Sequence, residues 1–444
     1  MSENIIELES KASSEAQPDR FDGWARKRVF ALLATVDGGH LTIVEPGGTR
    51  RFGDPAHQLR ATVFVRHPRL YGALALRGAM GGAESYMDGD WESDDLSAVI
   101  RIMARNRGAL EAFGKRLSWL TRPSLALFHR LRRNTVAGSR RNIAEHYDLG
   151  NEFFELFLDP TMMYSSGIFH DERASMEEAS TIKLDRICQK LDLGPDDHIL
   201  EIGTGWGGFA IHAARHFGCR VTTTTISRAQ YELARERVRE AGLSDRIEVL
   251  LQDYRALEGR YDKLVSIEMI EAVGHENLGE FMRICGQRLR EDGCAVIQAI
   301  TIADRDYEAD RRSVDFIKRY IFPGGQLVSL SAVNDAVARE STLRMTHLED
   351  FGPHYAETLR RWRETMYCNL EKIRALGLPE RFLRMWEYYF CYCEAGFDER
   401  TISVAQIVFE QPSTRRRSVL GSFSEGMLPE QRAPRRIAGA TAHH

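Results

Sequence analysis

Three glycines that follow a short apolar run are the residues of this chain best suited to hold a nucleotide-like ligand. Gly203, Gly205 and Gly208 come directly after the run Ile199–Ile202, and an apolar helical pattern follows over 209–217. Glycine lets backbone N–H groups approach a ligand closely, and the N-terminus of a helix offers it partial positive charge. The sequence therefore predicts a nucleotide cradle between a buried strand and a helix.

The spacing of these glycines also satisfies the dinucleotide fingerprint, but the acid that completes this motif is missing. In NAD-binding folds a carboxylate about 20 residues further on, at the end of the second strand, binds the ribose hydroxyls. The second strand is expected over 219–225, and it ends in Thr225-Ile226-Ser227. The pattern therefore disfavours NAD, and the neighbouring segments must identify the nucleotide.

Alternating strand and helix patterns from about residue 180 onward must position this loop. We expect five strands with helices between them, near 197–203, 219–225, 246–251, 261–268 and 292–301. A capping box, Ser227-Arg228-Ala229-Gln230, starts the second helix. A partly helical insertion follows residue 303, then Trp- and Tyr-rich helices over 355–376 and 380–395, and a last strand over 402–409. This alternation predicts an α/β fold with a doubly wound parallel sheet.

Polar segments stand where three further strands end, and ligands of such sheets bind beyond the carboxyl ends of the strands. Thr225 to Gln230 follows the second strand, and Gln252-Asp253-Tyr254, an acid and an aromatic that could hold an adenine, follows the third. The segment from Glu268 to His275 follows the fourth. Carboxylates at strand ends are often helix caps, but Glu271 stands out because its segment is apolar.

Composition excludes several classes of protein. The net charge is −4, 43% of the residues are hydrophobic, and the 444 residues predict two or three domains. No apolar run approaches the ~20 residues needed to span a bilayer. The seven cysteines are scattered and form no CxxC pair, which predicts reduced thiols in a cytoplasmic protein without a zinc site or any other metal site.

The remaining segments suggest a membrane-visiting protein. Between Arg101 and Arg141 lie eleven Lys or Arg and one acid, Glu111, interleaved with Leu, Phe and Trp. Such a stretch suits an anionic membrane surface, and nucleic acid or a merely solvated helix are the alternatives. The expected organisation has five parts: a disordered N-terminus over 1–20, an α+β domain over 21–100, a basic helical linker over 101–142, a catalytic domain over 143–411, and a flexible tail over 412–444. Within the α+β domain we expect a helix at 24–34 and strands at 40–44 and 61–65.

Several segments in the right order resemble the cyclopropane-fatty-acyl-phospholipid synthases, a family of methyltransferases that use S-adenosylmethionine (SAM) on unsaturated acyl chains. The matching segments are His146–Asn151, Leu158–Ser166, Leu200–Gly208, Gln252–Arg255, Glu268–Gly274, Lys318–Gly325 and Phe351–Tyr355. The resemblance implies a seven-stranded SAM-methyltransferase sheet with a helical insertion. Residues 70–100 resemble the N-terminal domain of the family more loosely, and we interpret this smaller domain as the part that binds and presents lipid or supports a dimer.

The resemblance implies two sets of site residues. Those expected to contact SAM are Tyr164, Ser165, Gly203, Gly205, Trp206, Gly207, Thr225, Ser227, Gln230, Gln252, Asp253 and Tyr254. In the family a bicarbonate ion, held by a Cys, a Glu, a His, an Ile backbone and a Tyr, serves as the base. The matching positions here are Ser166, Glu271, Gln298, Ile300 and Tyr355.

Three positions qualify this carry-over. Ser166 stands where Cys is usual and Gln298 where His is usual. Both can still form hydrogen bonds to an anion, but Gln298 cannot titrate. Cys393 matches a family cysteine sometimes taken as catalytic, although a packed helix thiol is the alternative because no base is adjacent to form a thiolate.

The implied reaction begins with attack of a cis double bond on the methyl group of SAM, which leaves a carbocation. Loss of a proton from the new methyl closes a cyclopropane ring, whereas loss from a neighbouring carbon gives a methylene or methyl-branched chain. We expect the cyclopropane, with the branched product as the alternative. An amine methyltransferase and a lipid-binding protein without turnover are further alternatives. The expected partner is a phospholipid surface on the inner face of the membrane, not nucleic acid, and the family suggests a homodimer.

Overall fold

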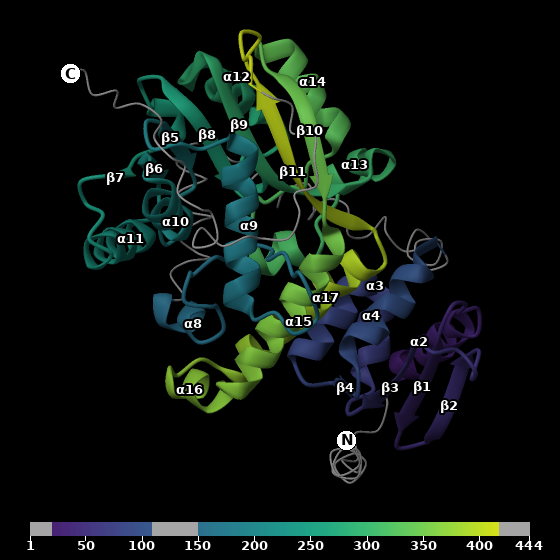
Figure 1. Cartoon of the computed structure of the whole chain (residues 1–444). Coiled ribbons are helices and arrows are strands. Elements are labelled where there is room, and N and C mark those ends of the chain that lie inside the picture. Colours follow the sequence, from purple (N-terminus) through teal and green to yellow (C-terminus); the bar gives the residue numbers. More distant parts are fainter. Residues whose placement is uncertain (1–19, 109–149, 417–444) are drawn as a thin grey trace, which may run out of the picture.

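The computed structural model describes residues 20–108 and 150–416, and its larger part is built on a seven-stranded sheet (Figure 1). The strand order is β10-β11-β9-β8-β5-β6-β7, and β11 runs antiparallel to both of its neighbours. The other neighbouring strands pair in parallel. The strands are β5 (His198–Ile202), β6 (Arg220–Thr225), β7 (Ile247–Leu251), β8 (Tyr261–Ile267), β9 (Leu289–Ile302), β10 (Arg344–Asp350) and β11 (Ile402–Glu410). The predicted doubly wound α/β sheet is confirmed.

Helices cover both faces of this sheet because successive strand residues point to opposite sides. Ile199 packs with residues of α9 (Met176–Leu191), α10 (Gly208–Phe217) and α11 (Arg228–Glu240). Its neighbour Leu200 packs on the other face with residues of α12 (Leu278–Arg288) and α14 (Leu330–Glu340). Buried apolar side chains on both faces hold the strands in register, so the carboxyl ends of the strands other than the antiparallel β11 lie along one edge.

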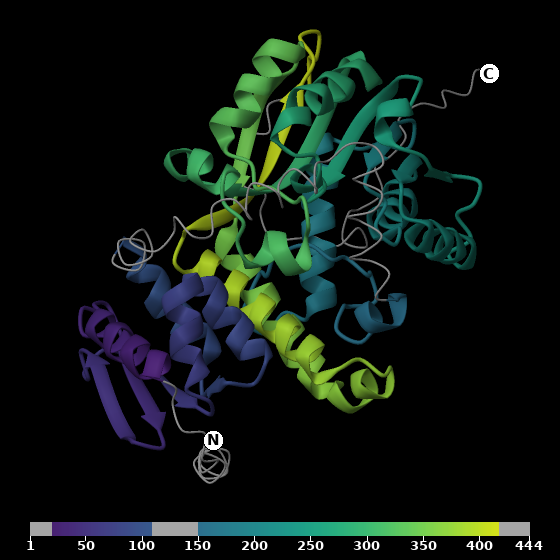
Figure 2. The ribbon, with the colours of Figure 1, turned by 180° about the vertical axis from the view of Figure 1, so that it is seen from behind.

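A second sheet, with order β2-β1-β3-β4, forms the N-terminal part. Its strands are β1 (His40–Glu45), β2 (Gly48–Gly53), β3 (Arg60–Val65) and β4 (Trp91–Ser93), and its helices are α2 (Arg20–Leu33), α3 (Arg69–Met87) and α4 (Leu96–Arg105). The expected boundary at residue 100 falls inside α4, because Leu96, Val99 and Ile102 continue the buried face of that helix. Seen from behind, α3 and α4 lie between the small sheet and α17 (Glu380–Asp398) (Figure 2).

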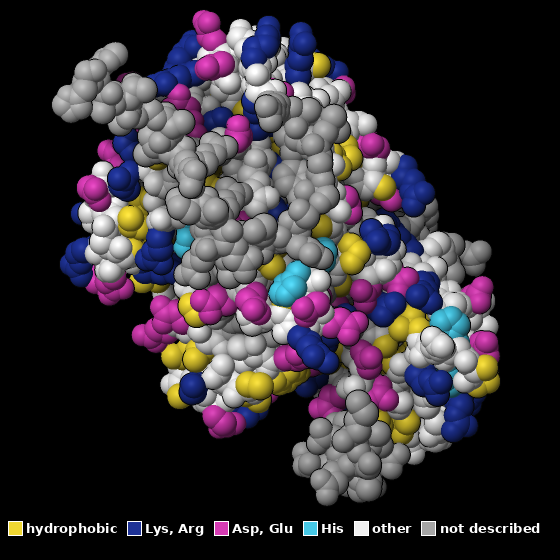
Figure 3. All heavy atoms as spheres, viewed as in Figure 1, with side chains coloured by type: hydrophobic (Ala, Val, Ile, Leu, Met, Phe, Trp, Pro, Cys, Tyr) yellow, Lys and Arg dark blue, Asp and Glu magenta, His cyan; other side chains and the backbone are white. Residues whose placement is uncertain are grey.

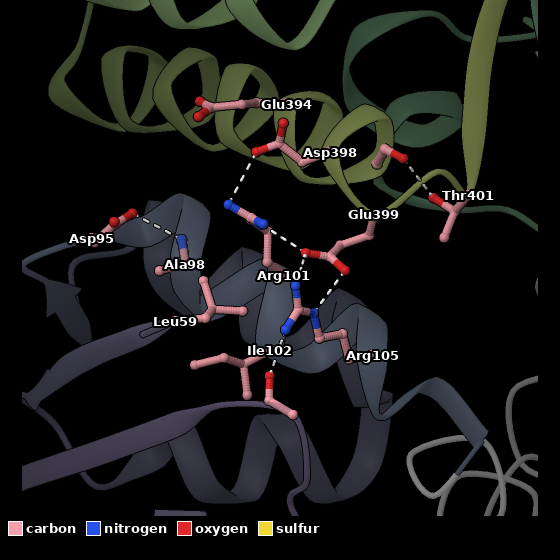
Figure 4. A network of polar contacts seen from close by, with 12 residues as sticks. Leu59, Asp95, Ala98, Arg101, Ile102, Arg105, Glu394, Asp398, Glu399 and Thr401 are labelled. Atoms are coloured by element: carbon pink, nitrogen blue, oxygen red, sulfur yellow. Dashed lines mark hydrogen bonds and ion pairs between the residues drawn. The ribbon is translucent and has the colours of Figure 1, made fainter. Parts of the chain in front are cut away.

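The first basic residues of the expected linker belong to this domain contact. Arg101 and Arg105 both donate to Glu399, at 2.8 and 2.7 Å, and Arg101 also pairs with Asp398 (Figure 4). These two side chains therefore join α4 to the end of α17. The part of the expected linker beyond residue 108 lies outside the described residues, which leave out 1–19, 109–149 and 417–444.

Aromatic helices pack beside the carboxyl edge of the large sheet. The helix expected over 355–376 is divided at Asn369 into α15 (Gly352–Cys368) and α16 (Leu370–Ala375). Trp362 and Trp386, from α15 and α17, are fully buried among the phenylalanines of the short helix α8 (Asn151–Glu155) and Phe157. The insertion after β9 contains α13 (Asp304–Arg311) and a π-helical turn, η5 (Ile317–Ile321). None of the described helices is long and apolar enough to cross a membrane.

Candidate active site

A cavity of about 1240 Å³ connects the carboxyl edge of the large sheet with the interior of the N-terminal part. Residues after β5, β6, β7 and β8 line its polar end. Apolar side chains of α2, α3 and the small sheet line the other end, among them Leu33, Leu41, Ile43, Val63 and Leu74. A ligand in this cavity can thus meet polar strand ends and an apolar channel at once.

The glycine loop forms part of the polar end. Gly203, Gly205 and Gly207 have φ values of +103°, +52° and +84°, which favour glycine over other residues. A Cβ at Gly205 would meet nothing within 4 Å, so the loop leaves open space there. The backbone N–H groups of Gly203 and Thr204 both donate to the carbonyl of Thr224, at 3.0 and 3.1 Å, which fixes the loop against β6. The sequence-predicted cradle therefore has a backbone shape that a ligand can approach closely.

The end of β6 carries a hydroxyl network in the place of the missing acid. Thr225 Oγ1 donates to Oε1 of Gln230 at 2.8 Å and accepts from the N–H of Ser227. Ser227 caps α11 by accepting from the N–H of Gln230, but Gln230 bonds Thr225 instead of completing the expected capping box. This arrangement presents neutral polar groups to the cavity.

The acid of the segment after β7, which could hold an adenine, forms an ion pair within that segment. Both carboxylate oxygens of Asp253 accept from the Arg255 guanidinium, at 2.9 Å each. Tyr254 packs edge-on against Phe281, and Gln252 donates its N–H to the carbonyl of Thr225. Asp253 and Tyr254 still line the cavity, so this segment forms a wall whose acid is already neutralised by Arg255.

Residues before α9 form the opposite wall. Tyr164 shares a hydrogen bond of 2.9 Å with the hydroxyl of Tyr389. Lys183, which is fully buried on α9, donates to Ser165 Oγ at 2.8 Å. Burial lowers the pKa of Lys183 to about 8, against the opposing effect of nearby carboxylates. Sequence reasoning missed Lys183, because a lysine in a helical pattern gives no signal of burial.

Trp206, which follows the first two glycines of the loop, is buried and donates from Nε1 to Asn151 at 2.8 Å.

The polar end of the cavity fits SAM, whose sulfonium and ammonium groups are positively charged. Glu201 lines the cavity, and its Oε2 atom is buried without a hydrogen-bond partner among the described residues. Burial raises the pKa of Glu201 to about 8, and the hydrogen bond from Thr223 and the charge of Lys183 oppose this rise. A cationic ligand would stabilise the ionised form of such a carboxyl. Together with the open space at Gly205, this unpartnered atom is suited to a cationic nucleoside.

Three of the five residues expected to hold a bicarbonate converge on Glu268 instead. Oε1 of Glu268 accepts from Nε2 of Gln298 at 2.7 Å and from the backbone N–H of Ser166 at 3.1 Å. Oε2 accepts from the hydroxyl of Tyr355 at 2.6 Å. The Ser166 hydroxyl donates to the carbonyl of Gly167. Glu268 belongs to a segment singled out in the sequence, but nothing there indicated that it would gather these donors.

The other two expected residues pair with each other. Oε1 of Glu271 accepts from the backbone N–H of Ile300, whereas its Oε2 is buried without a partner among the described residues. Burial and then the charge of Glu268 raise the pKa of Glu271 to about 8. The expected set is therefore split between two carboxylates. Because Ser166, Gln298 and Tyr355 already donate to Glu268, the expected set of residues does not fit a separate bicarbonate.

Cys393 lies in the wall of the cavity on α17. Burial raises the pKa of its thiol, which keeps the group protonated and a poor nucleophile. Burial therefore favours the packed thiol over the catalytic one.

The strand order and the glycine loop beside the switch point between β5 and β8 define the class of a SAM-dependent methyltransferase. The chain belongs to the mycolic acid cyclopropane synthetase family, whose model matches residues 135–407. The tuberculostearic acid methyltransferase UfaA1 of Mycobacterium tuberculosis is 39% identical over 355 residues, which cover 78% of this chain and 82% of that protein. The cyclopropane-fatty-acyl-phospholipid synthase of Escherichia coli K12 is 34% identical over 361 residues, or 79% of this chain and 88% of that protein.

A solved structure agrees with this assignment. Mycolic acid cyclopropane synthase CmaA1, complexed with SAH and CTAB, aligns with a TM-score of 0.57 and 30% identity over 61% of this chain and 98% of that chain. The protein is thus a SAM-dependent methyltransferase of the lipid-modifying cyclopropane synthase family.

Proposed function

We propose that this protein transfers a one-carbon unit from SAM to the cis double bond of unsaturated acyl chains in membrane phospholipids and closes a cyclopropane ring. The observation that carries the proposal is the continuity of the cavity from the glycine loop to the apolar side chains of the N-terminal part. An acyl chain lying in this channel would bring a mid-chain double bond to the carboxyl edge of the sheet.

The size and lining of the cavity support an acyl substrate. Its volume of about 1240 Å³ exceeds the ~300–1,000 Å³ of ordinary small-molecule pockets, so a cofactor and an alkyl chain can share it. Each methylene that leaves water contributes about 0.8 kcal/mol. Ten methylenes along Leu33, Ile43 and Val63 would therefore offset much of the cost of lifting a chain from the bilayer.

The residues around the polar end can support this chemistry. SAM, when bound, supplies an electrophilic methyl group. The π electrons of the alkene would form the new C–C bond while the C–S bond of that methyl group breaks and its electron pair stays on sulfur, which leaves SAH. Aromatic faces such as Tyr164, Phe322 and Tyr389, which line the cavity, would stabilise the resulting carbocation. The electron pair of a methyl C–H bond then closes the ring as its proton passes to a base. Tyr389 is buried and Tyr164 and Phe322 are half-buried, so these rings limit the access of water, which would otherwise trap the cation as an alcohol.

A methylene or methyl-branched product is the second candidate, and the similarity to UfaA1, named a tuberculostearic acid methyltransferase, favours it. Both products share the first step and differ in the carbon that loses its proton. The position of the base relative to the chain therefore decides the outcome.

Exposed aromatics on α2 support contact with a phospholipid surface. Phe21 and Trp24 are 40% and 44% exposed and stack at 5.7 Å, and the Arg28 guanidinium lies 5.5 Å from the Trp24 ring. Aromatic and basic side chains of this kind suit the headgroup region. Val29 and Leu33 of the same helix line the cavity, so α2 connects this surface to the channel. On the face seen in Figure 3, acidic and basic side chains of the described residues are interspersed.

Lipid analysis of cells that express the chain tests the proposal. A gain of one CH₂ with loss of the alkene supports ring closure, and the same gain with the alkene retained supports the branched product. No gain, despite SAH binding measured by calorimetry, would overturn both. In a vesicle assay, Phe21→Ala combined with Trp24→Ala is expected to weaken binding to anionic phospholipid, with the exposed Leu376→Ala as the matched control. Equal vesicle binding of both variants and the unaltered protein would exclude this surface as the membrane contact.

A further inference from the structure

We propose that the carboxylate of Glu268 is the resident base of this enzyme and takes the place that a bound bicarbonate is expected to fill. This inference rests on the proposed function, because it assigns the proton acceptor of that reaction. It makes the chain independent of an exchangeable anion.

The first argument is geometric. Three donors from distant parts of the chain meet on one carboxylate: Tyr355 from α15, Gln298 from β9 and the backbone of Ser166. These are the positions from which donors to a free anion were expected. Glu268 lines the cavity together with Tyr355 and Glu271, so its carboxylate lies at the boundary between the protein and the substrate space.

The backbone gives a second argument. Glu268 has a φ of +50°, a left-handed conformation that is uncommon for a residue other than glycine. Its N–H donates to the carbonyl of Gln298 at 2.8 Å, which fixes the residue directly after β8. Such a conformation costs stability and persists where the surroundings enforce it, often at a functional site. Here it turns the side chain toward its three donors.

Electrostatics separates the two neighbouring carboxyl groups. Burial raises the pKa of Glu268, but the hydrogen bonds from Tyr355 and Gln298 and the charge of Lys183 oppose this rise. One carboxylate oxygen of Glu271 has no hydrogen-bond partner among the described residues, and the pKa of this group is raised to about 8. Two carboxylates that share one site cannot both ionise easily, and the one with more donors keeps the charge. Glu268 is therefore the ionised member of the pair and Glu271 the neutral one.

The proposed step is balanced. The C–H bond of the transferred methyl breaks, and its electron pair forms the second C–C bond of the ring and neutralises the carbocation. The proton goes to Glu268, which becomes a neutral carboxylic acid and returns the proton to solvent before the next turnover. No oxidant, reductant or further ion is needed.

Removal of the carboxylate is the first arm of the test. Activity of the full chain is measured on vesicles of unsaturated phospholipid in CO₂-free buffer, with and without added bicarbonate. The unaltered protein is expected to be equally active in both. Glu268→Gln is expected to lose activity by about 10²-fold or more, since general base catalysis contributes 10²–10⁴-fold, while SAH binding stays unchanged. Glu232→Gln, an exposed carboxylate on α11, is the matched control.

The second arm separates a base from a merely structural carboxylate. Glycine accepts the φ of +50° without strain, so Glu268→Gly is expected to fold and to leave a space among the three donors. Bicarbonate or formate should then restore activity to this variant by about tenfold or more, because either anion can serve as the base. A structural role would give no such rescue.

The outcomes distinguish this inference from the proposed function. An unaltered protein that forms product but requires added bicarbonate would overturn the inference and leave the proposed function standing. So would a Glu268→Gln variant with full activity, or a folded Glu268→Gly variant that no anion rescues. An unaltered protein that binds SAH and forms no lipid product would instead overturn the proposed function.

Discussion

Nε2 of Gln406 donates a 3.0 Å hydrogen bond to Oε1 of Gln298, and this contact orients the Gln298 amide so that its own Nε2 faces Glu268. Gln406 is oriented in turn by the buried Lys190, which donates to its Oε1 atom and pairs with Glu349. Each amide therefore accepts on one side and donates on the other. A glutamine can thus serve as a fixed donor to Glu268 at a position where a histidine was the expected residue.

Replacement of Tyr355 by phenylalanine should move the pH dependence of activity. The phenol donates to Glu268, and loss of a hydrogen bond to the charged form raises the pKa of that carboxyl. Because the reaction needs the ionised form, the acidic limb of the kcat profile should shift to higher pH. A hydrogen bond to a charged group is worth about 1.5–3 kcal/mol, which corresponds to a shift of about one to two pH units.

The measurement is kcat against pH for Tyr355→Phe beside Tyr367→Phe. Tyr367 lies on the same helix, is half-exposed and does not line the cavity. A profile for Tyr355→Phe that keeps the unaltered midpoint would show that Glu268 does not control the acidic limb.

Replacement of Glu271 by glutamine should change how stability depends on pH. Burial raises the pKa of this carboxyl from 4.5 to about 8. A carboxyl with a raised pKa in the folded state stabilises the fold at low pH, and this contribution is lost as the pH rises through the folded-state pKa. The loss amounts to at most about 1.4 kcal/mol per pH unit.

Glutamine stays neutral, so the Tm of Glu271→Gln relative to the unaltered protein should increase between about pH 5 and pH 8. Glu232→Gln, on the surface, should follow the unaltered protein at every pH. Parallel curves for all three proteins would mean that Glu271 is ionised in the folded state at neutral pH.

The sequence allowed the large sheet and the glycine loop to be predicted because both depend on local patterns. Strand β10 was not anticipated, since Arg344–Asp350 is charged and only partly buried, and its pairing with β11 decides its conformation. Helix α3 was also missed: its glycines disfavour a helix, yet Gly81 and Gly82 are buried in close contact with the preceding turns.

The role of Glu268 could not be predicted for a different reason. Its three donors come from residues 102, 30 and 87 positions away, and no local pattern records that they converge. Periodicity indicates which residues are buried, whereas the hydrogen-bond partners of a buried carboxylate depend on tertiary packing. The resemblance implied that Ser166, Gln298 and Tyr355 hold a bicarbonate, whereas in the structure all three donate to Glu268.

Replacement of Thr225 by valine should weaken cofactor binding. The Thr225 hydroxyl donates to Gln230 and accepts from the N–H of Ser227. Without these contacts, Gln230, which lines the cavity, is no longer held in position. The net contribution of one neutral hydrogen bond is about 0.5–1.5 kcal/mol, so loss of that much binding free energy should raise the Kd for SAH by about two- to tenfold. Thr222→Val on the same strand, whose hydroxyl contacts His198 instead, is the control for calorimetry. Equal SAH affinity for both variants would remove Thr225 from the cofactor site.

Replacement of Glu399 by glutamine should loosen the contact between α4 and α17. Burial alone would raise the pKa of Glu399. The hydrogen bonds from Arg105 and Arg101 lower this pKa and outweigh burial, so the net pKa lies below 4.5. A carboxyl with a lowered pKa stabilises the fold above its unfolded-state pKa, and this contribution disappears as the pH falls through the folded-state value. Because both arginines are about one-third exposed, solvent screens the network, and we expect a loss of about 1 kcal/mol at neutral pH.

Urea unfolding of Glu399→Gln at neutral and acidic pH measures this contribution. The difference from the unaltered protein should be largest at neutral pH and low salt, and should shrink in acid and at high ionic strength, where the pair is protonated or screened. Glu371→Gln, an exposed carboxylate on α16, controls for the change of charge alone.

Residues of both α4 and α17 line the cavity, so Glu399→Gln should also lose activity on long acyl chains before it loses SAH binding. A variant as stable and as active as the unaltered protein would show that apolar packing between α3, α4 and α17 holds the two parts together without these ion pairs.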